Sequence, residues 1–458
     1  MNANRKVLLF VVYATGLYLL ASFFANIFHW KSQSVKRIDL IADIIKKQKE
    51  EKNNQVDSLD VKDIASINMA SRVNNKGNAN FYLYRTPHLI TNFSIDTNEA
   101  ALAGFLRKLY DLKNGKKKKV RIAYFGDSMI EGDLLTQTLR KLLQQMFGGS
   151  GVGFVPITSQ VSQFRTTVTD NYSDGWQDEN FKTEGDKSHL FISGHLFRGN
   201  GDWVQMKDQT ITDTSALIEK NLLCGFSSQP VTINVNNRPF IVHAIDNFNR
   251  ISIVNDKNKS IKLSVSDQRL PLYGISFESG SGVFVDNLSF RGITGIEFSK
   301  IDSSFLVSIA QHNSYDLIIF QYGVNLLFRP YDKNFYWYAR ALRPVVRKFK
   351  NCFPKTDFLL ISTADRAFRY ADEYQSATGI DSLIKVQALL AYETGSSFYN
   401  LFATMGGTNS IVDWTARKPS LANKDYIHPN HRGADILGKY FFEAIMNDYK
   451  KFTWGLKK

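Results

Sequence analysis

Two short polar motifs, far apart in the chain, contain the residue types that acyl transfer by a serine requires. Ser128 ends a Gly-Asp-Ser tripeptide that follows the apolar run 120–125, and Asp425 lies three residues before His428. A serine nucleophile needs a base within hydrogen-bond reach and a carboxylate that orients this base. Ser128, His428 and Asp425 are therefore a candidate triad, although an isolated Gly-Asp-Ser more often only caps a helix.

Further groups have the chemistry to stabilise an oxyanion, the negatively charged oxygen that forms during acyl transfer. Asn325 follows the apolar run 317–321, and a side-chain amide at a strand end can donate a hydrogen bond to such an oxygen. Gly292 follows a predicted strand, and a glycine lets the backbone N–H approach a ligand. The N-terminus of the helix predicted after Ser128 adds N–H groups and a favourable dipole.

The elements that must position these residues alternate between strands and helices. Such alternation predicts an α/β fold with a parallel sheet covered on both faces, in which ligands bind beyond the carboxyl ends of the strands. The motifs above fall at or near those ends. Apolar runs predict strands at 120–125, 283–285, 317–321, 358–362 and 398–401, and helical spacing predicts helices at 100–112, 134–146, 305–312, 336–349, 381–392 and 432–449.

The pattern changes between residues 158 and 280, where short alternating runs are separated by turn-forming Asn and Asp residues. Many short strands of this kind predict a β-sandwich. We therefore expect an inserted β-sandwich at 158–280 that divides the α/β domain into 86–157 and 281–458. Aromatic side chains of this region, such as Trp176 and Trp203, could stack on sugars, although in a β-sandwich they more often belong to the core.

The N-terminal residues predict attachment to a membrane. The apolar run 7–28 carries no charge and is long enough to cross a bilayer as a helix. The residues that follow it form a poor cleavage site, which favours an uncleaved signal-anchor over a cleaved signal peptide. Basic residues flank the run on both sides, so charge alone gives no orientation. The polar residues 29–85 predict a tether.

Composition narrows the functional classes. The formal net charge is +14, but part of the excess lies near the N-terminus and in the lysine run 116–119, and no nucleic-acid-binding motif accompanies it. The two cysteines, Cys224 and Cys352, form no Cys-x-x-Cys pair, which argues against a thiol-bound metal or a redox motif. The chemistry predicted for the triad requires neither a metal nor a cofactor.

Taken together, the motifs resemble the sequence blocks of the SGNH (GDSL-type) hydrolase superfamily. This resemblance implies a flavodoxin-like, three-layer α/β fold with Ser128 as nucleophile, His428 as general base and Asp425 as its partner. It also implies an oxyanion hole formed by the backbone N–H of Ser128, the backbone N–H of Gly292 and the side chain of Asn325.

A narrower resemblance is to peptidoglycan O-acetylesterases, in which a carbohydrate-binding-like β-sandwich follows the first block. It is carried by the runs GDSMIEGDLLTQTLR and GGSGVGFVP and by MGGTNSIVDW at 405–414, and it covers roughly 120–445. It implies a serine esterase that removes O-acetyl groups from a cell-envelope polysaccharide, with peptidoglycan as the expected polymer. With such a substrate, Asp127, Trp176 and Trp203 become candidate substrate contacts.

We therefore expect the protein to be located in the inner membrane, which its N-terminal helix crosses once, with the catalytic part facing the periplasm or the cell exterior. The expected partners are the membrane and an acetylated cell-wall polysaccharide, without nucleic acid. One alternative is an O-acetyltransferase, in which the same triad passes acetyl to a sugar with a membrane-bound acyltransferase partner. A lipase or thioesterase of the same superfamily and a non-catalytic wall-binding protein are further alternatives, which the inserted region and the complete triad, respectively, disfavour.

Overall fold

The structure, a computed structural model, describes residues 13, 79–94, 96 and 98–456. The helices and strands named below all lie in the unit Asn78–Lys458. Among the described residues, no helix has both the length and the hydropathy needed to cross a bilayer. The predicted anchor at 7–28, apart from Tyr13, lies outside the described residues, as does the predicted tether up to residue 78.

A six-stranded sheet supports the candidate site residues. Its order is β1-β19-β16-β15-β2-β14, with β1 antiparallel to β19 and the other pairings parallel, so the predicted parallel sheet is confirmed. Every residue of β15 is buried because helices cover both faces of the sheet. The strands are β1 (Ile90–Thr91), β2 (Lys119–Gly126), β14 (Gly282–Ser289), β15 (Leu317–Gln321), β16 (Asp357–Ile361) and β19 (Ser397–Tyr399).

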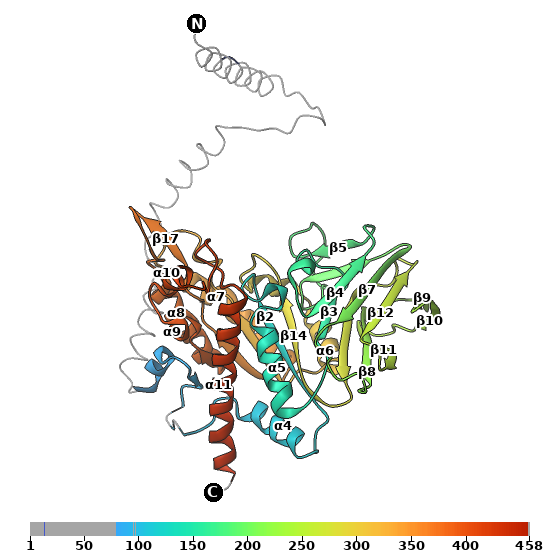
Figure 1. The fold of residues 1–458 in the computed structure, drawn as a ribbon, viewed down its shortest axis with the longest axis horizontal. Helices are drawn as coiled ribbons and strands as arrows, with labels where there is room; N and C mark the ends of the chain where they lie inside the picture. The colour runs from blue at the N-terminus through green and yellow to red at the C-terminus, as the bar shows by residue number, and fades with distance from the viewer. Residues whose placement is uncertain (1–12, 14–78, 95, 97, 457–458) are drawn as a thin grey trace. The chain divides into compact units, whose positions relative to one another are not determined.

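Helices on both faces of the sheet produce three layers (Figure 1). On one face, α4, α5 and α11 share an apolar core with the strands. On the other face, Phe125 and Phe320 stack with ring centroids 5.0 Å apart, and both meet Phe349 of α7 edge-on. The helices are α4 (Ala103–Lys113), α5 (Thr136–Phe147), α6 (Ser303–His312), α7 (Tyr336–Cys352), α8 (Ile380–Thr394), α9 (Leu401–Met405), α10 (Ser410–Ala416) and α11 (His431–Gly455), with 3-10 turns η1 (Ala79–Arg85), η2 (Glu131–Asp133), η3 (Ser162–Phe164) and η4 (Ile296–Lys300).

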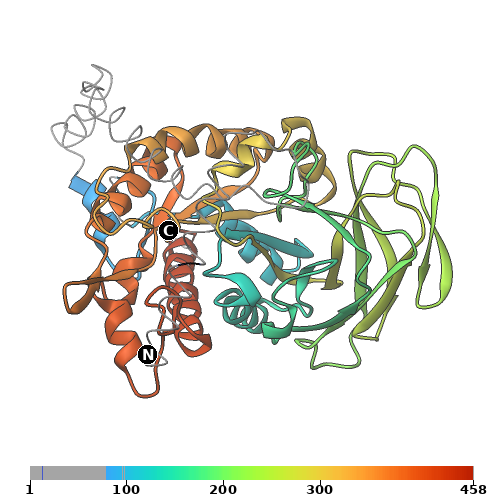
Figure 2. The same cartoon turned by 90° about the horizontal axis from the view of Figure 1, so that it is seen from above.

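Two antiparallel sheets lie beside the parallel sheet and are formed by the chain between α5 and β14 (Figures 1 and 2). Their orders are β10-β9-β12-β7-β4 and β11-β8-β13-β6-β5, and their side chains share a second apolar core. The sequence predicted that the antiparallel region begins at residue 158. Because β3, at Gly153–Pro156, pairs with β13, the region begins earlier. The strands are β3 (Gly153–Pro156), β4 (Val168–Tyr172), β5 (Gln177–Asn180), β6 (His195–Arg198), β7 (Asp202–Asp208), β8 (Ile218–Gly225), β9 (Val231–Val235), β10 (Arg238–Val242), β11 (Phe248–Asp256), β12 (Ser260–Val265) and β13 (Leu272–Ser279).

Glu278 of β13 joins the antiparallel sheets to the parallel sheet. Its buried carboxylate accepts a hydrogen bond from Arg121 of β2 at 2.7 Å and pairs with Arg250 of β11 at 2.7 Å. Burial alone would raise the pKa of Glu278, but Arg250 and Arg121 outweigh burial and hold this pKa far below its usual value. A buried carboxylate is costly without its partners, so this cluster fixes the antiparallel sheets against β2, the strand that leads to Ser128.

Candidate active site

Ser128 lies two residues beyond the carboxyl end of β2, whose neighbours in the sheet are β14 and β15. The chain turns there because the last residue of the strand is Gly126. A Cβ at that position would come within 2.7 Å of Ile130 Cγ1, so no larger residue fits without a shift. The turn leaves Ser128 only 8% exposed, at the end of the sheet where the other predicted residues also lie.

The helix predicted at 134–146 is present as α5, but its N-terminus does not adjoin Ser128. The 3-10 turn η2 intervenes, and α5 starts at Thr136. Gly132, Asp133 and Leu135 have positive φ values of 70°, 68° and 62°, and a right-handed helix cannot continue through such residues. Ser128 therefore neither caps α5 nor lies at its N-terminus, and the predicted contribution of that helix end to the site was wrong.

Ser128, His428 and Asp425 form one hydrogen-bonded series. The Oγ atom of Ser128 lies 2.8 Å from Nε2 of His428, and Nδ1 of the same ring lies 2.7 Å from Oδ2 of Asp425. The serine comes from the end of β2 and the other two residues from the loop before α11, 300 residues later in the chain. The structure thus brings together the three residues that the sequence proposed as a triad.

Local backbone bonds hold the carboxylate of Asp425 in place. Its Oδ1 accepts hydrogen bonds from the backbone N–H groups of Ile427 and His428, each at 3.0 Å. Burial alone would raise the pKa of Asp425, but the bonds from the His428 ring and from these N–H groups lower it overall. The ionised carboxylate can therefore keep accepting the proton on Nδ1, which leaves Nε2 free to act on Ser128.

Neighbouring elements brace the loop that carries His428. An isolated bridge pairs Ala422 with Pro429, and Asn430 caps α11 by accepting hydrogen bonds from two backbone N–H groups. A hairpin of β17 (Ala367–Tyr370) and β18 (Glu373–Ser376), which the sequence did not predict, packs beside the loop. Its Tyr374 ring stacks on Tyr426 with centroids 3.8 Å apart. The loop is therefore held on both sides.

Asn325 follows β15 and reaches the residue that precedes the nucleophile. Its Nδ2 donates to the Oδ2 atom of Asp127 at 3.1 Å and to the carbonyl of Ile293 at 3.0 Å. Asp127 is 1% exposed, and burial raises the pKa of its carboxyl to about 7. The prediction that Asp127 contacts substrate is thereby corrected: its carboxyl faces the protein interior and holds the amide of Asn325.

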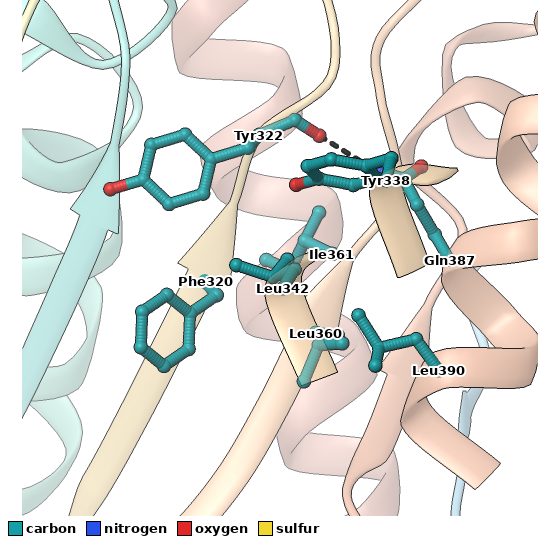
Figure 3. Close-up of a pocket in the computed structure, with 8 residues that line it drawn as sticks. All are labelled: Phe320, Tyr322, Tyr338, Leu342, Leu360, Ile361, Gln387 and Leu390. Atoms are coloured by element: carbon teal, nitrogen blue, oxygen red, sulfur yellow. Dashed lines mark hydrogen bonds between the residues drawn. The ribbon is translucent and has the colours of Figure 1, made fainter. Parts of the chain in front are cut away.

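The chain just before Asn325 is anchored from α8. Gln387 donates its side-chain amide to the carbonyl of Tyr322 at 2.7 Å, the bond drawn in Figure 3, and accepts the backbone N–H of Thr363 at 2.9 Å. The surrounding apolar space, lined by residues of the sheet, α7 and α8, belongs to the core behind the site. These bonds fix the turn at Gly323, whose φ of 148° and close approach to Thr363 exclude a larger side chain.

Gly292 lies in the loop after β14 and has a φ of 83°. The next residue, Ile293, receives the hydrogen bond from Asn325, so this loop adjoins the predicted oxyanion hole. Lys182, from the β5–β6 connection of the antiparallel region, reaches the same loop. A Cβ built on Gly292 would lie 3.3 Å from the Nζ atom of Lys182. The sequence reasoning did not single out Lys182, because nothing in its local pattern distinguishes it from other surface lysines.

Trp176 and Trp203, the predicted sugar contacts, lie together in the antiparallel region. The indole N–H of Trp176 donates to the carbonyl of Trp203 at 3.1 Å, and Trp176 packs against the core of that region. Lys262 lies over the ring of Trp203 at 5.2 Å. Neither tryptophan lines the cavity next to the Ser128 and Gly292 loops, so the structure does not bring them to the triad.

Arg366 is a second residue near the triad that the sequence did not reveal. Its guanidinium donates to the carbonyl of Val324 at 2.8 Å, which links the loop after β16 to the residue before Asn325. Burial lowers the pKa of Arg366, and attraction to Asp425 opposes this shift. The arginine therefore supports two loops of the site and adds positive charge near the carboxylate of Asp425.

Comparisons with known proteins address the fold. No protein-family model matches the chain, and no curated protein matches its sequence. A solved structure described as a peptidoglycan O-acetylesterase in action is 20% identical, with 77% of this chain and 98% of that chain covered and a TM-score of 0.64. A salicylyl-acyltransferase from a tetracycline biosynthetic pathway is 14% identical, covering 63% and 94%, with a TM-score of 0.28. A family two carbohydrate esterase from Cellvibrio japonicus is 9% identical, covering 62% and 99%, with a TM-score of 0.26.

Among these three, the peptidoglycan O-acetylesterase alone superposes well enough to define a common fold. Its structure matches over nearly its whole length. The chain therefore shares its fold with that peptidoglycan O-acetylesterase, as the resemblance in its sequence implied.

Proposed function

We propose that the chain is a serine esterase that removes O-acetyl groups from a carbohydrate, with acetylated peptidoglycan of the cell envelope as its substrate. The observation that carries this proposal is the unbroken series from Ser128 through His428 to Asp425, with distances of 2.8 and 2.7 Å. The fold shared with a peptidoglycan O-acetylesterase supports the choice of substrate.

In the proposed reaction, Ser128 Oγ attacks the carbonyl carbon of the acetyl ester while Nε2 of His428 takes the hydroxyl proton. Asp425 accepts the hydrogen bond from Nδ1 and stabilises the imidazolium. When the tetrahedral adduct collapses, the ester C–O bond breaks and His428 gives the proton to the departing sugar oxygen. Water then attacks the acyl-enzyme with His428 as base, which releases acetate and regenerates Ser128.

The negative oxygen of the adduct would be held by the backbone N–H groups of Ser128 and Gly292 and by the amide of Asn325. In the structure this amide already donates to Asp127 and to the carbonyl of Ile293. The oxyanion would therefore either share the amide of Asn325 with these two acceptors or replace one of them. Because Asp127 fixes the amide from the interior side, the donor is held near the reacting carbonyl before substrate binds.

The test is acetate release by the full chain from O-acetylated peptidoglycan and from 4-nitrophenyl acetate. The wild type should release acetate from both, and Ser128→Ala should lower kcat by about 10³-fold or more, as expected when a nucleophile is removed. Ser299→Ala changes an exposed serine outside the site and should keep full activity. Release that is equal in the wild type and in Ser128→Ala would contradict the assignment of the nucleophile, and absence of release from both substrates would overturn the esterase proposal.

The same acyl-enzyme could pass its acetyl group to a sugar hydroxyl, so acetylated glycan products should be measured in the same reactions. Transfer that exceeds acetate release and depends on Ser128 would replace the esterase proposal with an acetyltransferase. Glycan binding without either product would identify a wall-binding protein. The uncharged run 7–28 supports an inner-membrane location, and the proposed envelope substrate is the reason for placing the site on the periplasmic or outer side.

A further inference from the structure

A cavity of about 160 Å³ lies where the antiparallel region meets the loops of the candidate site. Its wall includes Glu131, three residues after Ser128, and the segment Ser289–Arg291 directly before Gly292. The opposite wall comes from the antiparallel region. Most of the side chains around the cavity are polar, including Arg165, Asp178, Asn180, Lys182, Ser193 and His195. A cavity of this composition suits a hydroxyl-rich ligand better than an acyl chain.

The carboxylates in the cavity wall have basic partners, whereas Lys182 has no carboxylate partner among the described residues. Each carboxylate already has a basic partner: Glu131 pairs with Arg291, and Asp178 lies 2.8 Å from the ring of His195. Asp133 accepts two hydrogen bonds from Arg140, which lies behind the wall. Within the described part of the chain, no carboxylate lies at ion-pair distance from Nζ of Lys182. The cation available to a ligand is therefore Lys182.

Local contacts hold Lys182 at the edge of the cavity. Its backbone N–H donates to the side chain of Asn180 at 2.9 Å, and its Nζ lies 5.5 Å from the centroid of the Phe290 ring. The ammonium also lies beside Gly292, as the 3.3 Å approach to a Cβ at that position shows. An anion bound by Lys182 would thus be next to the loop that we propose stabilises the reacting ester.

Three buried polar atoms of the same wall lack hydrogen-bond partners, and one of them, Oε2 of Glu131, instead forms the ion pair with Arg291. The hydroxyl of Ser193 is unpaired, although this residue is only 4% exposed. One terminal nitrogen of Arg165 also makes no hydrogen bond, and its nearest carboxylate oxygen, on Asp133, is 3.6 Å away. Buried polar groups are rarely left unpaired, so the Ser193 hydroxyl and the Arg165 nitrogen can each bond to a polar molecule in the cavity.

We propose that this cavity binds a sugar residue with a free carboxylate, and that Lys182 pairs with the carboxylate while the acetyl ester of the same glycan reaches Ser128. This inference rests on the proposed esterase function and adds a binding site that the triad does not define. Lys182 is then a specificity-determining residue supplied by the antiparallel region. Such a role gives that region a direct part in substrate choice, in place of the sugar stacking expected for Trp176 and Trp203.

The test separates binding from turnover. Full-length Ser128→Ala protein is titrated calorimetrically with N-acetylmuramic acid and with N-acetylglucosamine, which lacks the carboxylate-bearing group. D-glucuronic acid and D-glucose form a second pair. The acid of each pair should bind about tenfold more tightly, as expected for one charge-assisted contact, and the preference should shrink as NaCl is raised. In the Lys182→Met background the preference should disappear.

Two further variants keep the proposal falsifiable. Lys257→Met removes an exposed lysine in the turn between β11 and β12 and should keep the acid preference. Ser193→Ala should weaken the acid and the neutral sugar alike, because the hydroxyl is not charged. Equal affinity for acid and neutral sugars, a preference that survives Lys182→Met, or failure to bind either sugar would overturn the proposal.

These outcomes are distinct from those that concern catalysis. Acid-selective binding that depends on Lys182, without acetate release by the wild type, would retain the binding site and reject the esterase. Acetate release that depends on Ser128, without acid preference, would retain the esterase and reject the site. In the wild type, Lys182→Met should lower kcat/KM for an acetylated acidic glycan about tenfold more than it lowers kcat/KM for 4-nitrophenyl acetate.

Discussion

The carboxyl of Asp127 accepts a hydrogen bond from the side-chain amide of Asn325 at 3.1 Å, although the two residues follow different strands, β2 and β15. The other carboxyl oxygen of Asp127 accepts the backbone N–H of Met129 at 3.0 Å. One buried group thus connects the turn that presents Ser128 with the predicted oxyanion donor. A change at Asp127 should therefore affect both stability and catalysis.

The first prediction concerns the pH dependence of stability. Burial raises the pKa of Asp127 from 3.8 to about 7, so the folded chain binds this proton more tightly than the unfolded chain. This contribution is fully present below pH 3.8 and is lost as the pH rises through 7. Linkage makes it roughly 2.5 kcal/mol larger at pH 5 than at pH 8. Urea unfolding should show that Asp127→Asn removes this difference.

The control for that experiment is Asp372→Asn, because the Asp372 side chain is 98% exposed. Its pH dependence should match that of the wild type. If Asp127→Asn and the wild type lose the same unfolding free energy between pH 5 and pH 8, the carboxyl of Asp127 does not hold its proton as described.

The second prediction concerns the oxyanion donor. Asn325→Ala should lower kcat for a small acetyl ester by about 10²–10³-fold with little change in KM, because the amide acts on charge that develops only in the transition state. Asn334→Ala, in the same loop before α7, removes only an exposed bond to the N–H of Tyr336 and should keep wild-type kcat. A similar kcat for Asn325→Ala and the wild type would remove Asn325 from the oxyanion hole.

Local sequence patterns predicted the sheet and the triad well because those signals are short-range. The buried run of β15 coincides with the strand predicted at 317–321, and β9 shows the short alternation expected within 158–280. The order of the sequence blocks then placed Ser128 and Asn325 after the ends of neighbouring strands and His428 just before the last helix. A parallel sheet brings such ends together whatever the chain length between them, which explains why this part could be predicted.

Features that depend on tertiary contact were not predictable from the pattern. The separation of α5 from Ser128 follows from positive φ values at residues such as Leu135, a conformation that its side-chain type does not suggest. The interior position of Asp127 depends on Asn325, which lies 198 residues away. Lys182 is distinguished only by the loop of Gly292 that it meets after folding. Such roles arise from packing between distant segments and leave no local periodicity.

The third prediction concerns the residue that orients the base. Asp425→Asn keeps the size of the side chain, but an amide cannot accept hydrogen bonds at both ends as the carboxylate does. The imidazole would lose the partner that sets its tautomer, and kcat should fall by about 10⁴-fold, the effect seen when a triad carboxylate becomes an amide. Asp413→Asn, on the exposed side of α10, should leave kcat unchanged. A loss below tenfold would show that His428 is oriented by other groups.

The final prediction concerns the support beneath the turn after Ser128. Arg140 of α5 donates two hydrogen bonds to the buried carboxylate of Asp133, at 2.7 and 2.9 Å. Burial alone would raise the pKa of Asp133, but Arg140 and Arg165 outweigh it and hold this pKa well below its usual value. The stabilisation is therefore present at neutral pH and is lost as the pH falls below the usual range for a carboxyl.

Arg140→Met should lower the free energy of unfolding at pH 7 by about 3–5 kcal/mol, because it leaves the Asp133 charge buried with too few partners. The double variant Asp133→Asn/Arg140→Met should recover part of this loss, since the uncompensated charge is then absent. Lys141→Met, the adjacent exposed residue of α5, should change the free energy by less than about 0.5 kcal/mol. Urea unfolding measures all three, and a double variant no more stable than Arg140→Met would show that the loss comes from the bonds of Arg140 to the carbonyl of Val285.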